Sequence, residues 1–575
     1  MAQDNLGGMY DGGWGIAQDK AKAVHWYRKA AEQGNAYGQT HLGVMYEAGE
    51  GITKDLKLAL DWYRKSAAQN NRDGLYNLGR MYDYGVGKDP VQAAKWYAKA
   101  AELGQASAQN NLGFLYDTGT GIELDDAKAV YLYRKAADQN NLNAQHNLGL
   151  MYDYGEGVAE DNGEAARWFR IAARRGHAKA QYDLARLYET GEGLVKDYNV
   201  ALHWYGKAAA QNNTYAINSL GIMYATGLGV AKDPRQAVFW YEKAAKLGYA
   251  IAQSNLGAMY EDGKGVEQNY ATAAGWYRKA ADQGEASAQF NLALMYEDGI
   301  GFAQNKRTAA EWYLKAAEQG FVHAQINLGL LYDLGQGVEE NKAAAARWYR
   351  AAADLGHATG QTNLASLYSE GKGVKKDDAV AARLYLEAAV QGNARAQNNL
   401  GMMYLNGNGV KKDNTSALNW FKSAADQNYA DAQNNLAVMY ATGKGVKRNS
   451  KTAVSWYRKA AGQDYGLAVS NLAMMYADGK GVKKNYKKAR ELLLKAVQLR
   501  EMNAFANMGY LYRNGFGVKA SYVTSYMWYI LSIRAGYTEA AETVAWLEKR
   551  LSKKNVKRAR AMAERCRAAG YKQCN

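Results

Sequence analysis

The sequence has few cysteines and prolines and lacks any long hydrophobic run. Only 2 of its 575 residues are Pro. Because Pro breaks helix interiors, this scarcity fits an almost wholly helical chain. Hydrophobic residues make up 48% of the chain, yet no segment approaches the roughly 18 consecutive apolar residues of a membrane span. No charged-then-apolar leader opens the sequence, so we expect no secretory signal.

Residues that usually carry catalysis or bind metals are also scarce. The 7 His side chains are scattered without metal-ligand spacing, and no HExxH, GxSxG or SxxK arrangement stands outside the general pattern of the chain. We therefore predict no catalytic residue, no metal site and no cofactor, and expect that the protein is not an enzyme. The His residues are His25, His41, His146, His177, His203, His323 and His357.

What the sequence does contain is a Tyr every 36 residues, with one interval of 34. A fixed period between 20 and 50 residues is typical of a solenoid, in which each unit buries its apolar face only against its neighbours. The length would otherwise suggest about four domains. The fifteen repeat tyrosines are Tyr10, Tyr46, Tyr82, Tyr116, Tyr152, Tyr188, Tyr224, Tyr260, Tyr296, Tyr332, Tyr368, Tyr404, Tyr440, Tyr476 and Tyr512.

Each unit is predicted to begin with one amphipathic helix. In the unit around Tyr260, Ala252, Leu256 and Met259 share a helical face with this Tyr. In every unit a Gly-x-Gly pair follows three and five residues after the Tyr and should end the helix. We assign these glycines to a tight turn rather than to phosphate binding, because no strand precedes them.

A second helix is predicted to follow a short polar loop. Every unit has Asp, Asn or Ser at the expected N-cap, and Pro90 and Pro234 stand directly after two of these caps, at the tolerated first helical position. Thirteen units end this helix with Gly or Asn. Asp464 and Arg500 are the exceptions, so we expect less regular turns there.

Two further features concern the loops and the core. The short third unit has lost two residues before Asp89, which makes the loop between the helices the part that tolerates length changes.

A Trp recurs in the second helix of twelve units and Leu replaces it in three, so we interpret this stripe as core packing. The three replacements are Leu132, Leu384 and Leu492.

The repeat unit resembles the Sel1-like repeat, a relative of the tetratricopeptide repeat. The resemblance implies a right-handed α/α superhelix whose first helices line the concave face, and a role as an adaptor that gathers other proteins. The composition also looks bacterial. The matching residues in one unit are Ala252, Gln253, Asn255, Leu256, Gly257, Met259, Tyr260, Gly263, Gly265, Val266, Trp276, Tyr277, Lys279, Ala280 and Ala281.

We therefore predict an all-α solenoid of about fifteen 36-residue repeats over residues 1–536, with a helical C-terminal cap over residues 537–575. Only nine residues precede Tyr10, so the first helix should be truncated. Val544 and Leu547 occupy the apolar positions of another first helix, and a charged helix is expected from about Val556.

Asn recurs five residues before the repeat Tyr in twelve units, although it is a mediocre helix former. It would either grip a partner's peptide backbone on the concave face or form an inter-helix hydrogen bond that fixes repeat stacking. The preceding residue varies, and an acid often follows the Tyr. The candidate protein-binding residues are Asn77, Asn111, Asn147, Asn255, Asn291, Asn327, Asn363, Asn399, Tyr76, Tyr182, Phe290, Asp117, Asp153, Glu261 and Glu297.

Charge is unevenly distributed. Residues 1–370 contain 37 Lys and Arg against 42 Asp and Glu, a net of −5, whereas residues 371–575 contain 35 against 14, a net of +21. A repeated basic loop would form a basic ridge that attracts an acidic partner or an anionic membrane or envelope surface. Nucleic acid is disfavoured because the aromatic residues are committed to the core. The basic-ridge residues are Lys375, Lys376, Lys411, Lys412, Lys447, Arg448, Lys483 and Lys484.

The only two cysteines, Cys566 and Cys574, lie in the predicted cap. Two free thiols would suit the cytosol, and a disulfide would suit a periplasmic or secreted protein. Similar C-terminal pairs in exported Sel1-like proteins favour the disulfide, although no leader is visible. Some Cys-rich Sel1-like proteins are described as β-lactamases or penicillin binders, but they have a Cys pair in each repeat, which this chain lacks.

The function predicted from the sequence is a non-enzymatic protein-binding scaffold. The alternative is attachment to an anionic surface through the basic C-terminal third. The sequence does not identify the partner.

Overall fold

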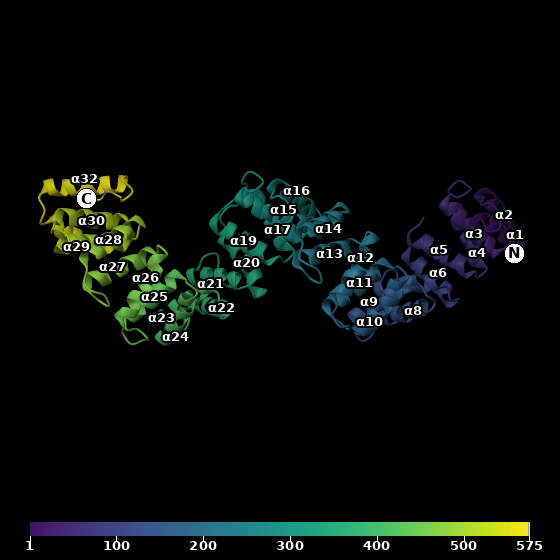
Figure 1. Ribbon diagram of the computed structural model, residues 1–575, viewed down its shortest axis with the longest axis horizontal. Helices are drawn as coiled ribbons and strands as arrows, with labels where there is room; N and C mark the ends of the chain where they lie inside the picture. Colours follow the sequence, from purple (N-terminus) through teal and green to yellow (C-terminus); the bar gives the residue numbers. More distant parts are fainter. Residues whose placement is uncertain (573, 575) are drawn as a thin grey trace. The chain divides into compact units, whose positions relative to one another are not determined.

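The computed structural model describes residues 1–572 and 574 and is helical throughout its ordered elements. In this part of the chain there are 32 α-helices and one 3₁₀ helix, and no strand. The chain divides into two compact units, Met1–Gln283 and Gly284–Asn575. Each contains sixteen of the α-helices, which are labelled in Figure 1. The prediction of an all-α repeat fold is confirmed.

The first unit contains eight helix pairs, most of them with 13-residue helices. The first helix, at 11 residues, is shorter than its counterparts. The elements are α1 (Ala2–Gly12), α2 (Lys20–Glu32), α3 (Ala36–Ala48), α4 (Leu56–Ala68), α5 (Arg72–Asp83), α6 (Pro90–Glu102), α7 (Ala106–Thr118), α8 (Asp126–Asp138), α9 (Leu142–Tyr154), α10 (Asn162–Arg174), α11 (Ala178–Thr190), α12 (Tyr198–Ala210), α13 (Thr214–Thr226), α14 (Pro234–Lys246), α15 (Ala250–Asp262) and α16 (Tyr270–Asp282).

The second unit contains seven such pairs and a C-terminal segment. Its elements are α17 (Ala286–Asp298), α18 (Lys306–Glu318), α19 (Val322–Leu334), α20 (Lys342–Asp354), α21 (Ala358–Glu370), α22 (Asp378–Val390), α23 (Ala394–Asn406), α24 (Asn414–Asp426), α25 (Ala430–Thr442), α26 (Ser450–Gly462), α27 (Gly466–Asp478), α28 (Tyr486–Gln498), α29 (Met502–Asn514), α30 (Tyr522–Arg534), η1 (Thr538–Ala540), α31 (Ala541–Glu548) and α32 (Lys553–Ala568).

Within each unit, consecutive helices pack against one another, from α1 to α16 and from α17 to α30. Odd-numbered helices are the first helices of the repeats and even-numbered ones are the second helices. Every second helix has the predicted N-cap. Its side chain accepts a hydrogen bond from a backbone N–H of the first turn, as Asp55 does from Lys57 and Leu58. The same holds for the other fourteen caps.

The turn after each second helix is uniform, which corrects one prediction. Asp464 and Arg500 have φ angles of 58° and 60°, in the left-handed region that Gly and Asn occupy in the other repeats. The backbone N–H of Arg500 donates to the carbonyl of Val497, and that of Glu501 to the carbonyl of Ala496, as in the regular turns. Packing between successive repeats therefore imposes this conformation even on residues that favour it poorly.

The two glycines of the Gly-x-Gly pair have different tasks. The first, such as Gly371, ends the helix in the left-handed conformation. The second meets the preceding repeat: a Cβ on Gly373 would lie 2.3 Å from the carbonyl oxygen of Lys342. In the short third repeat, Gly85 is not left-handed, yet the N–H of Asp89 still donates to the carbonyl of Tyr82. This loop absorbs the deletion as predicted.

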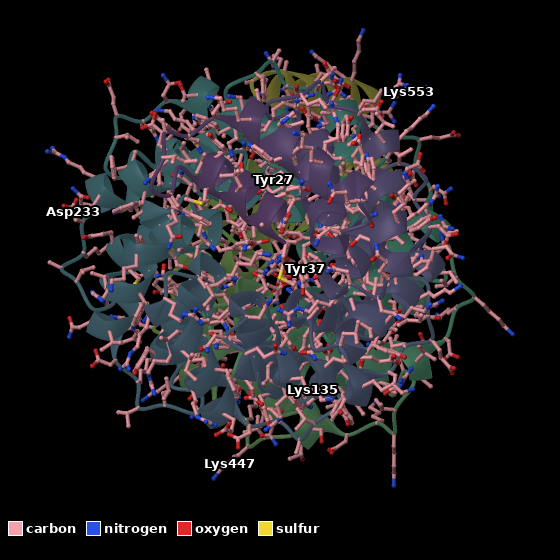
Figure 2. All side chains as sticks on the ribbon, turned by 90° about the vertical axis from the view of Figure 1, so that its right-hand side faces the viewer. Tyr27, Tyr37, Lys135, Asp233, Lys447 and Lys553 are labelled. Carbon is pink, nitrogen blue, oxygen red and sulfur yellow. A yellow bond between two sulfur atoms is a disulfide. The ribbon has the colours of Figure 1, made fainter. Side chains whose placement is uncertain are left out.

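The core is built from small residues and a Tyr of the second helix. Tyr63, Tyr97 and Tyr277 are almost completely buried, and Tyr27 lies inside the ribbon in Figure 2. The neighbouring Trp stripe was predicted to be core, and this is only partly correct. Trp168, Trp312 and Trp528 are buried, but most of the others are half-buried.

Seven of the half-buried indoles are covered on one face by a Lys three residues later, whereas Trp348 and Trp420 have Ala351 and Ser423 there. Lys279 Nζ, for example, lies 4.1 Å from the ring centroid of Trp276. In these repeats one face of the indole stays at the surface, where a cation stacks on it.

A buried Gln pair connects successive repeats. The amide nitrogen of Gln39 donates to the carbonyl of Ala31 in the preceding second helix, and its Oε1 accepts from Gln69 at 2.8 Å. Seven other repeats have the same Gln–Gln bond, thirty residues apart, at 2.7–2.9 Å. Gln39 thus ties together three helices, whereas Gln361 donates to Glu387 of α22 instead of to the preceding second helix.

The C-terminal segment is helical and packs on the last repeat. η1 and α31 follow α30, and α32 also packs on α30. A disulfide joins Cys566 of α32 to Cys574, and both side chains are buried. The rest of the predicted tail, residues 573 and 575, lies outside the described residues.

Candidate functional site

The candidate residues occupy one stripe of each first helix. Positions nine, five and two residues before the repeat Tyr, and one residue after it, are spaced four, three and three apart. This spacing places them on the same helical face. We call this surface the first-helix stripe.

The Asn at the middle of the stripe forms a hydrogen-bond ladder between repeats. Asn255 Nδ2 donates to Oδ1 of Asn218, 37 residues earlier, at 3.0 Å. The same bond joins Asn147 to Asn110, Asn435 to Asn398, Asn471 to Asn434 and Asn507 to Ser470. Where His or Asp replaces Asn, an equivalent pair forms, as between Asp183 and His146 at 2.7 Å. Of the two roles considered for this Asn, the ladder corresponds to the inter-helix hydrogen bond that fixes repeat stacking.

Other candidate Asn side chains contact residues nearby. Asn111 and Asn327 donate to the buried Tyr97 and Tyr313. Asn77 accepts from Arg80, Asn363 from Arg395 and Asn399 from its neighbour Asn398. Asn291 is half-buried.

The variable residue before the Asn packs against aromatic rings. The Tyr76 ring lies 5.9 Å from Tyr97. Tyr182 lies 5.7 Å from Tyr205 and 5.6 Å from Tyr215, and Phe290 lies 5.1 Å from Phe321.

The acid after the repeat Tyr accepts a hydrogen bond from the buried Tyr of the second helix. Tyr277 donates to Glu261 at 2.7 Å and Tyr313 to Glu297 at 2.6 Å. We call this an acid–tyrosine pair. Six further repeats have one: Tyr27–Asp11, Tyr63–Glu47, Tyr97–Asp83, Tyr133–Asp117, Tyr205–Glu189 and Tyr349–Asp333. Burial and the carboxylate raise the pKa of Tyr63, Tyr205 and Tyr313 far above its ordinary value.

Asp117 and Asp153 are themselves held in low-dielectric surroundings. Burial raises the pKa of both carboxyls. The repeat that contains Asp153 has Phe169 in place of the buried Tyr, and Asp153 pairs with Arg186 of the next repeat instead. The acidic candidates therefore take part in packing.

Sequence reasoning missed the exposed positions of the stripe. Nine and two residues before the repeat Tyr stand apolar side chains that lie at the surface. Phe114 and Tyr215 are 52% and 54% exposed. Their signal was available, because they are apolar residues outside the buried periodicity of the first helix. The exposed members are Tyr37, Val44, Phe114, Tyr215, Ile251, Leu330 and Met402.

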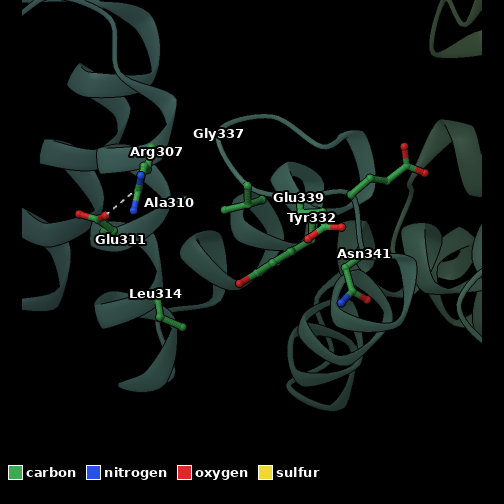
Figure 3. A pocket seen from close by; sticks show the side chains of 10 residues that line it. Arg307, Ala310, Glu311, Leu314, Tyr332, Gly337, Glu339 and Asn341 are labelled. Carbon is green, nitrogen blue, oxygen red and sulfur yellow. Dashed lines mark ion pairs between the residues drawn. The ribbon is translucent and has the colours of Figure 1, made fainter.

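A cavity of about 630 Å³ lies on this stripe in the first unit, bordered by Phe114, His146, Asn147 and His177. Another, of about 700 Å³, lies between α18 and the loop after α19 in the second unit and is drawn in Figure 3. It is lined by Leu314 and Tyr332 and contains no candidate residue. Of these two cavities, the first coincides with the predicted surface and the second does not.

All eight basic-ridge residues are exposed. Lys447 points away from the ribbon in Figure 2. Lys376 lies 3.9 Å from Asp378, and Lys484 stacks over Tyr486 at 5.4 Å. The loops between first and second helices thus present cations to solvent in the second unit.

The repeats match one family along nearly the whole chain. The Sel1 repeat matches residues 1–35, 36–71, 72–105, 106–141, 142–177, 178–213, 214–249, 250–285, 286–321, 322–357, 358–393, 394–429, 430–465, 466–500 and 505–537. The chain belongs to the Sel1 repeat family. This confirms the family resemblance, and the Sel1 repeat fold generally serves protein–protein interaction.

Solved structures of other Sel1 repeat proteins are similar to this one. A protective antigen of uropathogenic Escherichia coli strains, which displays an SLR fold, is 35% identical over 85% of this chain and 97% of its own, with a TM-score of 0.60. A Sel1 repeat protein from Oxalobacter formigenes is 31% identical over 55% of this chain and 94% of its own, with a TM-score of 0.43. No curated protein sequence matches the chain.

Among residues 1–572 and 574, no group of three or more His, Cys, Asp or Glu side chains is placed to hold a metal ion. No helix in this same part of the protein has the length and apolar character needed to cross a membrane.

Proposed function

We propose that this Sel1 repeat protein is a non-enzymatic scaffold whose first-helix stripe binds a partner protein or peptide. The observation that supports the proposal is the recurrence of exposed apolar side chains on this one face. Exposed apolar and aromatic side chains that recur on one face supply anchors for a partner protein. Phe114 and Tyr215 on the first unit, and Leu330 and Met402 on the second, are anchors of this kind.

The Asn amides have a supporting part in this proposal. Those in the ladder already bond to the preceding repeat, so they hold the first helices at a fixed spacing and thereby position the apolar anchors. A triple substitution of Asn255, Asn291 and Asn327 by Ala would disturb this spacing as well as any direct contact. Substitution of the exposed anchors separates binding from folding more cleanly.

The test begins with affinity capture by the full chain, identification of the partner by mass spectrometry, and binding of the purified partner. Phe114→Ser/Tyr215→Ser and Leu330→Ser/Met402→Ser variants should keep the wild-type circular dichroism. Whichever pair lies in the interface should weaken binding at least about tenfold, because anchors cost 1–2 kcal/mol or more when truncated. Val195→Ser is the matched control, since Val195 is an exposed apolar residue of a loop outside the stripe. Wild-type affinity in both stripe variants would refute the proposal.

The exposed basic ridge favours a second candidate function, attachment to an anionic surface. Eight exposed cations on equivalent loops give a surface that attracts acidic lipids or envelope polymers. Co-sedimentation with phosphatidylglycerol vesicles should decrease in a Lys447→Gln/Lys483→Gln/Lys484→Gln variant and should decrease with added salt. Equal sedimentation of the variant and the wild type would exclude this function.

A further inference from the structure

Four repeats lack the acid of the acid–tyrosine pair but retain the Tyr: Ser369 and Arg513 replace the acid in the eleventh and fifteenth repeats, and Ala replaces it in two others. In the seventh repeat Ala225 follows the repeat Tyr and Tyr241 is the buried Tyr. In the thirteenth repeat Ala441 and Tyr457 occupy the same positions. Neither tyrosine hydroxyl has a hydrogen-bond partner among the described residues, whereas eight other repeats supply a carboxylate.

A cavity opens at each of these two places. The one beside Tyr241 measures about 260 Å³ and the one beside Tyr457 about 470 Å³. Equivalent residues line both, although they lie 216 positions apart in the sequence. They are Ala225, Lys232, Pro234, Tyr241, Asn255, Ala258, Met259, Asp262 and Lys264 in one, and Ala441, Arg448, Ser450, Tyr457, Asn471, Met474, Met475, Asp478 and Lys480 in the other.

The cavities have the polarity of an anion site. The Tyr hydroxyl is a donor, and Lys232 or Arg448 adds a cation to the lining. The carboxylates in the linings are already neutralised, since Asp262 pairs with Lys264 and Asp478 with Lys480, each at 2.6 Å. A carboxylate from another molecule can therefore occupy either cavity without lying next to an unpaired negative charge.

We propose that each cavity binds a carboxylate side chain, Glu or Asp, supplied by the partner. The carboxylate takes the place that Glu189 and Glu261 occupy toward Tyr205 and Tyr277, where the oxygens lie 2.5 and 2.7 Å apart. Asn255 and Ala258 belong to the first-helix stripe, so this inference rests on the proposed function. It adds that the partner binds through a segment that contains Glu or Asp. The carboxylate accepts a hydrogen bond from the Tyr hydroxyl and is balanced by the nearby cation.

The test uses a small probe and does not need the partner. Met259 and Met475 line the two cavities, so ¹³C-methyl Met spectra of the full chain report on each. Titration with N-acetyl-glutamate amide should shift both methyl signals, and N-acetyl-glutamine amide should not. Equal shifts with both probes, or none with the first, would overturn the inference.

Filling one cavity from within the chain provides the control. Ala225→Glu restores the arrangement of eight other repeats and should fold. It should abolish the response of Met259 while Met475 still responds, and Ala441→Glu should do the reverse. A Met259 response that survives in Ala225→Glu would refute the site.

The partner-binding assay separates this inference from the proposed function. If Ala225→Glu/Ala441→Glu binds the identified partner as tightly as the wild type, the carboxylate sites are wrong, although the stripe still binds. If the Ser variants of the stripe bind normally while the Met signals respond as expected, the proposed function is wrong and the carboxylate sites stand as small-anion sites.

Discussion

Gln325 and Leu355 occupy positions that are bonded to each other in eight other repeats, and here they cannot bond. Gln325 Nε2 donates to the carbonyl of Ala317 at 3.3 Å, but its Oε1 is buried without a partner among the described residues. Gln145 and Arg175 form the other mismatched pair, and Gln145 Oε1 is likewise unpaired there. A buried carbonyl oxygen that lacks a donor destabilises its repeat.

Leu355→Gln should therefore stabilise the protein. The new amide supplies the donor that Gln325 lacks and removes a 61% exposed Leu, so we expect a gain of about 1 kcal/mol in the repeat that contains it. The increase is measured as a higher urea midpoint at an unchanged slope. Leu247→Gln is the matched control, because its partner position holds the buried apolar Ile217 and no acceptor. An equal increase in the urea midpoint of both variants would show that replacing an exposed Leu by a polar residue is enough to explain the effect.

Asn471→Ala should destabilise the second unit. The substitution removes the donor to Asn434, whose side chain is only 2% exposed, and leaves its Oδ1 without a partner, at a cost of about 1–3 kcal/mol. The double variant Asn434→Ala/Asn471→Ala should cost less than the sum of the two single variants. Additive losses in urea titrations would mean that the ladder bond does not couple the two repeats.

Gly373→Ala should be far more damaging than Gly356→Ala. Both glycines have left-handed φ angles, 68° and 80°, so both substitutions carry about 1 kcal/mol of backbone strain. Nothing lies within 4 Å of a Cβ at Gly356, whereas at Gly373 it would collide with the backbone of Lys342. Thermal denaturation of the two variants should separate the cost of a left-handed φ angle from the cost of the collision between repeats. Similar midpoints would show that the preceding helix shifts at little cost.

Stability should decrease between pH 6.5 and pH 4 through His177. Burial, the neighbouring His146 and Lys179 lower the pKa of His177 from 6.5 to about 4, against the opposing effect of Asp183. The neutral ring also caps α11, because Nδ1 accepts from the N–H of Ala180.

His177 is protonated below about pH 6.5 in the unfolded chain but only below about pH 4 in the folded chain. Unfolding between these pH values therefore takes up a proton, and it becomes more favourable as the pH falls. His177→Asn keeps a capping side chain and does not titrate, so its urea midpoint should depend less on pH in this window. An unchanged pH dependence would assign the effect to other groups.

The candidate site was predictable only in part. The Asn and acidic stripes were found because they repeat, but the sequence left two roles open for the Asn and assigned the acids to the binding surface. In the structure Asn255 bonds to Asn218 of the preceding repeat, and Glu261 bonds to Tyr277 of the other helix in its own repeat. The apolar anchors Phe114 and Tyr215 do not repeat as one residue type, so periodicity did not reveal them.

By itself, the sequence determined the helix pairs, their caps and their stacking order, because these depend on local chemistry repeated every 36 residues. Asp55 caps α4 and Gly371 ends α21 through bonds within a few residues. Only the tertiary structure decided which polar side chains form hydrogen bonds within the protein and which cavities remain open to solvent. Ala225 and Ala441 look like ordinary substitutions in the sequence, and only the structure shows that they line cavities together with Tyr241 and Tyr457. Such pairings join residues on different helices, and their distance in space is set by packing.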